Sequence, residues 1–215
     1  MVSVADDSEH KNTQQLRKAY TARSAEEIRE YYDQWAADYE THMGNVGYTH
    51  PTMVAAMLSR HVPPADEAVL DAGAGTGIMA EILTAMGYPN IVGIDNSPKM
   101  LAAAANKRKY RDLHQMTLGE PLGFADDHFA AVSSAGVFTE GHAPLSGFDE
   151  LVRVTRAGGH IVFSVSRTYL DGMFEEKGKA LEAAGRWRFV DASERYNSTP
   201  LEGELPARVY AFQVV

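Results

Sequence analysis

Residues 69–77 read VLDAGAGTG and residues 91–95 read IVGID, with an amphipathic segment between them. In the first stretch a short apolar run meets glycines at three alternate positions, and the second is an apolar run that ends in Asp95. A glycine turn after a strand lets a ligand approach the backbone closely. An acid that ends the next strand can accept hydrogen bonds from both hydroxyls of a ribose. The two stretches therefore predict one nucleoside-binding half of an α/β sheet.

The glycine spacing narrows the choice of nucleoside. A dinucleotide pattern G-x-G-x-x-G/A that starts at Gly73 requires Gly or Ala at position 78, where Ile78 stands. No Gly-Lys-Ser/Thr follows, which excludes a P-loop. Asp71 adds a negative charge just before the turn, a poor neighbour for a pyrophosphate. The pattern favours a ligand with a cationic centre, a ribose and no phosphate, such as S-adenosylmethionine.

Several segments resemble the class I S-adenosylmethionine-dependent methyltransferases. Residues 71–77 (DAGAGTG) resemble motif I of that family, and residues 93–101 (GIDNSPKML) resemble motif II. Residues 151–162 resemble its helix-turn-strand segment, with Ala157 in place of the usual proline. The chain is most similar to the methyltransferase-like proteins named for the Williams-Beuren chromosomal region. The segments that carry this closer likeness are residues 32–40 (YDQWAADYE), 134–136 (SAG) and 140–142 (EGH).

Composition limits the classes of partner. The 215 residues carry a formal net charge of −9 and include no cysteine. A strongly acidic chain argues against nucleic acid and anionic membranes as main partners. The lack of cysteine excludes disulfides and cysteine-based zinc sites and fits a cytoplasmic protein. The eight histidines are scattered, so we expect no metal site. The N-terminus has no signal core, and no apolar run approaches a membrane span.

Alternating strand and helix patterns predict a doubly wound, mostly parallel sheet. The family resemblance implies a Rossmann-like sheet of seven strands, with an antiparallel last strand and N-terminal lid helices. We expect a mobile segment at 1–22 and one domain at 23–215, divided into a helical lid (23–62) and an α/β core (66–215). The strands are expected at 68–72, 91–95, 115–118, 129–134, 160–166, 187–190 and 209–215. Helices are expected after Ser24, from Pro51 to Leu58, after Gly77 and Ser97, and at 148–156 and 170–184, with a loop at 44–47.

The cofactor contacts are expected where the parallel strands end, the edge at which open α/β sheets bind ligands. For three of these residues, a structural role is an alternative to contact with the cofactor or the acceptor. Asp71 either faces the ammonium group of the cofactor or fixes the turn, Met100 either flanks adenine or belongs to the core, and Ala135 either leaves room for the acceptor or is simple close packing. By the family resemblance, the loop at Gly119 and Glu120 lies near adenine. The full set is Trp35, Tyr39, Asp71, Gly73, Ala74, Gly75, Asp95, Asn96, Met100, Gly119, Glu120 and Ala135.

Ile28, Tyr32, Trp35 and Tyr39 recur at helical spacing, which predicts one helix with an aromatic face. By resemblance this helix covers the cofactor, and its aromatic rings can favour a sulfonium. The stripe can equally be the buried side of the helix. We expect the acceptor pocket between this helix, residues 48–50 and residues 167–173.

Glu140 and His142 follow the fourth strand, near the expected acceptor, and either can take a proton. A solvated loop is an equal alternative for this pair. The sequence thus predicts a methyltransferase that acts on a small molecule. Two other functions stay open: a regulatory or partner module that binds S-adenosylmethionine without turnover, and a protein methyltransferase. The protein methyltransferase is less favoured because no Asn-Pro-Pro-Tyr-type signature follows the fourth strand.

Overall fold

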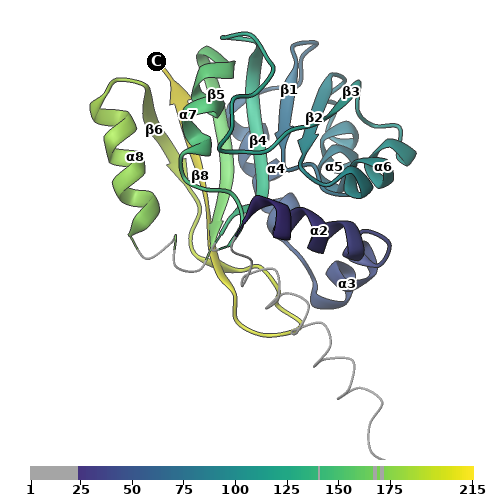
Figure 1. Cartoon of the computed structure of the whole chain (residues 1–215). Coiled ribbons are helices and arrows are strands. Elements are labelled where there is room, and N and C mark those ends of the chain that lie inside the picture. Colours follow the sequence, from purple (N-terminus) through teal and green to yellow (C-terminus); the bar gives the residue numbers. More distant parts are fainter. Residues whose placement is uncertain (1–23, 140, 167–168, 170–171) are drawn as a thin grey trace, which may run out of the picture.

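The apolar segments pair into one mixed sheet, which the computed structural model describes with its helices for residues 24–139, 141–166, 169 and 172–215 (Figure 1). The strand order is β3-β2-β1-β4-β5-β8-β6, and β7 pairs with β8 beside this path. The strands are β1 (Val69–Ala72), β2 (Ile91–Asp95), β3 (Asp112–Gln115), β4 (Phe129–Phe138), β5 (Thr155–Ser166), β6 (Trp187–Ala192), β7 (Tyr196–Asn197) and β8 (Pro206–Val214). The helices are α2 (Ala25–Trp35), α3 (Tyr39–Val46), α4 (His50–His61), α5 (Ile78–Ala85), α6 (Pro98–Asn106), α7 (Gly147–Val154) and α8 (Met173–Ala183).

The sheet is parallel from β3 to β5 and changes direction at β8. Strand β8 runs antiparallel to β5, β6 and β7. This confirms the predicted Rossmann-like sheet, mostly parallel with an antiparallel last strand. The short strand β7 adds an eighth strand that the sequence pattern did not predict.

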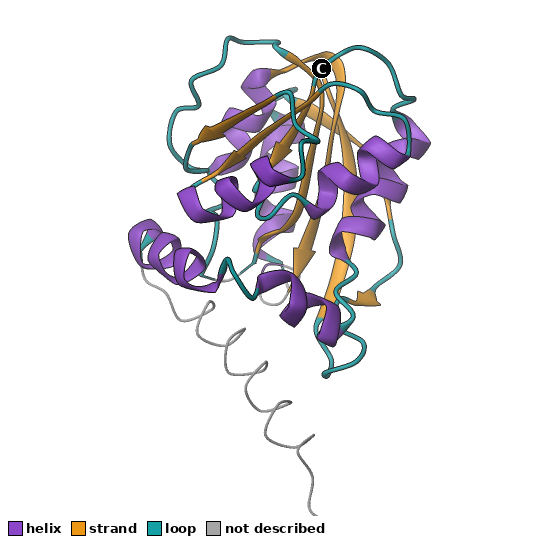
Figure 2. Cartoon of the chain, turned by 90° about the vertical axis from the view of Figure 1, so that its right-hand side faces the viewer, coloured by secondary structure: helices purple, strands orange, loops and turns teal. Residues whose placement is uncertain are grey.

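Helices cover both faces of the sheet, as a doubly wound fold requires (Figure 2). On one face, α4 and α5 bury Val54, Leu58 and Leu83 against the strands. On the other face, α7 and α8 bury Phe148 and Phe174. The helix α4, which the sequence assigns to the lid, therefore packs against the core. The elements that lie at the carboxyl ends of the strands are α2 and α3 (Figure 1).

The central strands are buried along most of their length because helices cover them on two sides. All four residues of β1 are buried, and so are the first six of β4. Such strands read as continuous apolar runs rather than as alternating patterns. This explains why β1 and β2 lie within one residue of their predicted bounds.

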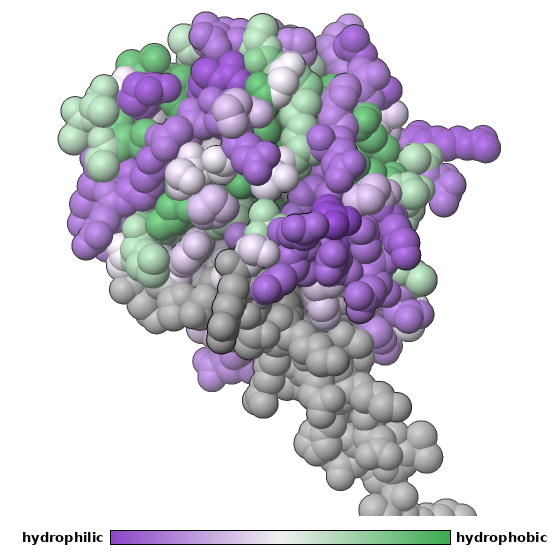
Figure 3. Space-filling model, viewed as in Figure 1, coloured by the Kyte–Doolittle hydropathy of each residue, from purple (hydrophilic) through white to green (hydrophobic). Residues whose placement is uncertain are grey.

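The predicted aromatic helix is wrong in its length. Helix α2 begins after Ser24, whose side chain accepts a hydrogen bond from the Glu27 backbone as predicted, but it ends at Trp35. A turn follows, and Tyr39 opens α3 instead of ending α2. The turn brings α3 back so that Tyr39 packs edge-on against Trp35, with ring centroids 4.9 Å apart. The outward face of α2 is hydrophilic (Figure 3).

The loop expected at residues 44–47 is also wrong, because α3 continues through Gly44 to Val46. Met43 and Val46 are buried with Trp35, and this packing outweighs the low helix propensity of Gly44. Only Gly47 behaves as a terminator. Its left-handed conformation, with φ of 68°, ends the helix.

Strand β3 lies three residues earlier than predicted, at Asp112–Gln115 instead of 115–118. It is an edge strand whose residues are partly exposed, so its apolar pattern is weak. The apolar side chains of Met116 and Leu118 follow the strand rather than form it. Strands β4 and β5 are both longer than predicted, and the extra residues of β4, from Ala135 to Phe138, run between two pockets described below.

Three predictions lie wholly or partly outside the described residues. They are the mobile segment at 1–22, the role of Glu140, and the place of residues 167–173 at the acceptor pocket, of which 167, 168, 170 and 171 are not described. The part of the chain that the structure describes contains no helix long and apolar enough to cross a bilayer.

Candidate functional site

A pocket opens where β1, β2 and β4 end beneath α2, and its empty space is about 780 Å³ including the part open to solvent. We call it the first pocket. It is lined by Ala25, Ile28, Tyr32, Tyr39, Gly73, Gly75, Ile94, Asp95, Asn96, Met100, Met116, Thr117, Leu118, Ala135, Gly136, Val137, His142, Ala143 and Pro144.

The glycine turn after β1 supplies the floor of the first pocket. The backbone N–H groups of Gly73 and Ala74 both donate to the Ile94 carbonyl, at 2.9 and 2.8 Å, which fixes the turn against β2. Gly75 has φ of 54°, and a Cβ added there would meet no atom within 4 Å. That empty space is the pocket itself, so Gly75 leaves its backbone open to a ligand. A Cβ at Gly73 would instead overlap the Val137 side chain, so Gly73 serves packing as well.

Asp95 ends β2 and lines the pocket beside the turn. Its Oδ2 accepts a hydrogen bond from the Gly75 N–H and its Oδ1 accepts one from the Ser97 N–H, both at 2.9 Å. Burial raises the pKa of this carboxyl, while the backbone donors work in the opposite direction. A carboxylate has about four lone-pair positions, so each oxygen can accept a further hydrogen bond. Asp95 therefore joins the turn to α6 and keeps acceptor capacity for a ligand in the pocket.

Asp71 is not among the residues that line the pocket. It is 1% exposed and accepts a 2.6 Å hydrogen bond from the Tyr110 hydroxyl. Burial raises the pKa of the Asp71 carboxyl to about 7; the charge of Asp95 also raises it, and the Tyr110 hydroxyl opposes the rise. Asp71 is thus a buried group behind the turn, and an approaching cation would favour its ionised form.

On the side away from the turn, the pocket is mainly apolar. Asn96 and Met100 line it as predicted, and Met116 and Leu118 add apolar surface from the segment after β3. Gly119 and Glu120 were predicted here, but neither is among the lining residues. A Cβ at Gly119 would lie against the Pro144 ring, and Glu120 is exposed. The loop reaches the pocket through residues 116–118 because β3 ends earlier than expected.

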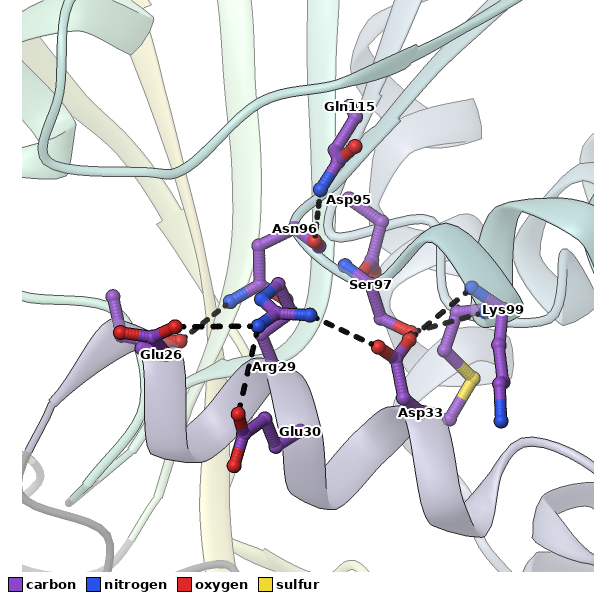
Figure 4. Close-up of polar contacts among 11 residues, drawn as sticks. Glu26, Arg29, Glu30, Asp33, Asp95, Asn96, Ser97, Lys99 and Gln115 are labelled. Atoms are coloured by element: carbon purple, nitrogen blue, oxygen red, sulfur yellow. Dashed lines mark hydrogen bonds and ion pairs between the residues drawn. The ribbon is translucent and has the colours of Figure 1, made fainter.

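Helix α2 is fixed over the first pocket by polar contacts to the start of α6 (Figure 4). Asp33 Oδ1 accepts hydrogen bonds from the Ser97 hydroxyl at 2.6 Å and from the Lys99 N–H at 3.2 Å. Its Oδ2 pairs with Arg29 at 3.2 Å. An acidic side chain near the first turn of a helix is favourable, since the N–H groups there lack partners within the helix. The Asp33 carboxylate therefore holds the lid against the strand ends.

A second pocket adjoins the first on the far side of the aromatic side chains. It is lined by Tyr32, Trp35, Tyr39, Met43, Tyr48, His50, Gly136, Thr139, His142, Ser166, Ser198, Thr199 and Leu205. Four residues, Tyr32, Tyr39, Gly136 and His142, line both pockets. Trp35, predicted as a cofactor contact, faces only the second pocket, and Ala74 is buried and lines neither.

The boundary between the two pockets is the end of β4. Ala135 and Gly136 both line the first pocket. A Cβ at Gly136 would overlap the Tyr48 hydroxyl, so only glycine lets that phenol approach the strand. His142 Nε2 lies 2.7 Å from the Tyr32 hydroxyl, which links the segment after β4 to the lid. Of the two predicted proton acceptors, His142 is therefore at the boundary of the pockets.

Sequence reasoning placed the aromatic helix over the cofactor but did not include Ile28 and Tyr32 among the site residues, and it missed the segment after β3. Ile28 and Tyr32 line the first pocket, and both stand in the aromatic and apolar stripe that the sequence shows. Met116, Thr117 and Leu118 follow a parallel strand, so the rule that ligands bind beyond strand ends points to them once β3 is placed correctly. Val137, Ala143 and Pro144 carry no comparable signal. The described residues contain no group of three or more His, Asp or Glu side chains that could hold a metal ion.

The sequence of this chain is similar to a family model and to several known proteins. A family model described as "Methyltransferase domain" matches residues 70–163. Methyltransferase-like protein 27 of Homo sapiens is 33% identical over 164 residues, which cover 73% of this chain and 66% of that protein. Demethylmenaquinone methyltransferase of Chlorobaculum parvum is 31% identical over 143 residues, which cover 64% of this chain and 58% of that protein. The chain thus spans about two thirds or less of the length of these relatives.

Solved structures share the fold at lower identity. A TehB-like SAM-dependent methyltransferase from Corynebacterium glutamicum matches with a TM-score of 0.60 and 20% identity, over 84% of this chain and 98% of that one. The [4+2]-cyclase SpnF matches with a TM-score of 0.67 and 16% identity, over 90% of this chain and 97% of that one.

The family match runs from β1 to β5, the strands whose ends build the first pocket. The likeness to methyltransferase-like protein 27 also confirms the predicted resemblance to the Williams-Beuren-region proteins. On these grounds the chain belongs to the class I S-adenosylmethionine-dependent methyltransferases.

Proposed function

We propose that this protein transfers a methyl group from S-adenosylmethionine to a small-molecule acceptor. The observation that carries the proposal is the open backbone at Gly75 beside the Asp95 carboxylate, since both line one pocket and a hydrogen bond joins them. A side chain at position 75 would fill the space that the cofactor needs. The methyltransferases among the relatives support the same activity. The cofactor supplies an electrophilic methyl group on a positively charged sulfur.

The residues of the first pocket fit each part of this cofactor. Asp95 would accept hydrogen bonds from the ribose hydroxyls, and Asn96 and Met100, which line the same pocket, would flank adenine. The backbone of Gly73 and Gly75 would lie beneath the methionine part, before the free N–H groups at the start of α5. Asp71 would balance the ammonium group from behind the turn.

The boundary between the pockets would be the place of methyl transfer. Ala135 and Gly136 are small, so they leave room for an acceptor beside the sulfur. Tyr32 and Tyr39 line both pockets, and their aromatic rings would favour a sulfonium and exclude water. Methyl transfer needs the acceptor atom at roughly 3–3.5 Å from the methyl carbon and in line with the leaving sulfur. Holding that geometry is the main task of the chain.

A proton acceptor is needed only when the acceptor atom carries a proton at working pH. His142 is the described residue placed for that role, because it lines both pockets and contacts the Tyr32 hydroxyl. Glu140, two residues earlier, is the second candidate from the sequence. In either case the side chain would take the proton that the acceptor loses as the new bond forms.

The fold alone does not decide between turnover and binding. A [4+2]-cyclase shares this fold, and a module that binds S-adenosylmethionine without turnover remains the second candidate. The experiment is incubation of the purified chain with methyl-labelled S-adenosylmethionine and a library of small metabolites. Label recovered in a metabolite, and absent with the Gly75→Val variant, supports the proposal. Tight binding of the cofactor with no label transferred to any acceptor favours the module.

A further inference from the structure

The second pocket differs from the first in the chemistry of its walls. Its aromatic side chains come from α2, from the turn into α3 and from Tyr48. Tyr32 and Trp35 are nearly parallel, with an interplanar angle of 21° and ring centroids 5.9 Å apart. Tyr39 stands edge-on to Trp35 at 73°. Flat aromatic walls of this kind bind flat apolar surface well.

No Asp, Glu, Lys or Arg side chain stands among the described residues that line this pocket. A charged ligand would lose its hydration here without meeting an opposite charge, and this is costly in free energy. The polar groups that do face the pocket are hydroxyls and imidazoles. The described part of the lining therefore favours uncharged compounds and keeps hydrogen-bonding capacity.

His50 is one of the buried polar residues of this pocket, with 4% of its surface exposed. Its Nδ1 lies 2.6 Å from the Tyr196 hydroxyl, a contact between α4 and β7. Burial lowers the pKa of His50 to about 3, so the ring is neutral at physiological pH. Burial also raises the pKa of Tyr196, so its hydroxyl keeps its proton. His50 thus acts as a fixed, uncharged hydrogen-bonding group at the wall.

A further observation, that of an unsatisfied polar group, concerns Thr139. It is 2% exposed and lines the pocket, and its Oγ1 is buried with no hydrogen-bond partner among the described residues. A buried hydroxyl without a partner destabilises a fold, and native proteins seldom keep one without a reason. A ligand with its own hydroxyl would satisfy Thr139 as donor or acceptor.

We propose that the second pocket, as the acceptor site of the proposed methyl transfer, binds an uncharged compound with a flat ring and a hydroxyl group, and that Thr139 Oγ1 recognises that hydroxyl. The inference rests on the proposed function for the role of the compound. The recognition itself rests on the aromatic walls, the lack of charged lining and the unpaired threonine. Thr139 is here a specificity-determining residue.

The test uses the full chain saturated with S-adenosylhomocysteine and three probes of one ring: phenol, toluene and benzoate. Binding is followed by titration in nuclear magnetic resonance spectra. Phenol is expected to bind about ten-fold more tightly than toluene, because one hydrogen bond to a buried partner changes the affinity by about that factor. Benzoate is expected to bind more weakly than phenol because its charge is not balanced.

The Thr139→Val variant is expected to bind phenol no better than toluene, with toluene unchanged. It removes a hydroxyl that has no hydrogen-bond partner among the described residues, so the fold should not be destabilised. Thr84→Val is the matched control, because the Thr84 Oγ1 is also buried without a partner but lies in α5, away from both pockets. Thr139→Ser keeps the hydroxyl and is expected to keep the preference for phenol.

Equal binding of phenol and toluene by the natural chain would overturn the inference, as would tighter binding of benzoate or an unchanged preference in Thr139→Val. Failure of S-adenosylhomocysteine to bind is a different result and counts against the proposed function. The same titrations on the ligand-free chain then decide the recognition by Thr139 separately.

Discussion

The two pockets are built in different ways, although they share the end of β4. The first pocket depends on backbone and on the ends of adjacent strands, with Gly73, Gly75 and Asp95 close together in the sheet. The second pocket depends on side chains gathered from α2, α3, α4, β4, β5 and the segment around Ser198. The first is therefore fixed by a short stretch of sequence, and the second by the packing of distant segments.

This difference in construction fits two different tasks, the binding of a common cofactor in the first pocket and the recognition of a particular compound in the second. A rigid turn with a carboxylate beside it suits a cofactor common to a whole family, because the geometry does not depend on surface side chains. A pocket made of side chains from many segments can change its shape with few substitutions while the fold stays the same. We expect changes in the first pocket to affect binding of the cofactor most.

The largest effect is expected from Gly75→Val. The new side chain enters the empty space of the first pocket, and Gly75 has a positive φ that valine rarely adopts. Affinity for S-adenosylhomocysteine should fall by about a hundred-fold or more, since overfilling a fitted site costs several kcal/mol. Titration calorimetry measures the loss, and circular dichroism checks the fold.

Gly158→Val is the matched control for this variant. Gly158 also has a positive φ, of 79°, and open space at its Cβ, but it lines neither pocket. It carries the same kind of backbone strain without filling the site, and it should bind S-adenosylhomocysteine like the natural chain. Equal losses in both variants would show that strain, not the pocket, causes the effect.

Asp95→Ala is expected to weaken S-adenosylmethionine binding by about 2–4 kcal/mol, because the ribose hydroxyls lose a charged acceptor. Part of the loss comes from the turn, since Asp95 also accepts from the Gly75 N–H. The Asp95→Asn variant keeps one acceptor oxygen and should lose less. A calorimetric loss below about 0.5 kcal/mol, smaller than one ordinary hydrogen bond, would remove Asp95 from the site.

The raised pKa of Asp71 predicts that the affinity for S-adenosylmethionine depends on pH. Its pKa in the ligand-free chain is about 7, above the usual value for aspartate, so below pH 7 most of this carboxyl is protonated. A bound cation favours the ionised form, and binding then releases a proton. Affinity for S-adenosylmethionine should therefore rise by about ten-fold from pH 6 to pH 8 and level off above that. Asp71→Asn should flatten the profile in the same buffers, and an identical slope in that variant would contradict the role of Asp71.

The smallest effect is expected from Asp33→Asn, which weakens the contact of α2 with Ser97 and Lys99. The lid should open more often, and S-adenosylhomocysteine should dissociate about three- to ten-fold faster, as expected for one charged hydrogen bond near the surface. Stopped-flow fluorescence measures the rate. Glu30→Gln removes a neighbouring acid that pairs only with Arg29, at 3.7 Å, and it should leave the rate unchanged.

The sequence points to the turn and the strand-end acid of the first pocket for a physical reason. Glycines at positions 73 and 75 and an acid at position 95 are local signals, because a turn and a strand end are set by neighbouring residues. The central strands are also clear, since buried parallel strands are continuous apolar runs. The edge strand β3 is misplaced for the opposite reason, as its residues are partly exposed.

The second pocket could not be read from the sequence in the same way. The break between Trp35 and Tyr39 depends on packing of Met43 and Val46 against Trp35, which helical spacing does not reveal. The contact of His50 with Tyr196 joins residues 146 positions apart. Residues 48–50 were expected near the acceptor pocket, and Tyr48 and His50 line the second pocket. Thr139 has no comparable signal in the sequence, because what distinguishes it is a buried hydroxyl without a hydrogen-bond partner among the described residues.

Uptake of S-adenosylmethionine and S-adenosylhomocysteine by the purified chain, measured by equilibrium dialysis, tests the central claim most directly. The open turn at Gly75 and the carboxylate at Asp95 predict saturable binding of one molecule per chain, lost in Gly75→Val and kept in Gly158→Val. No uptake of either compound by the natural chain would contradict the account.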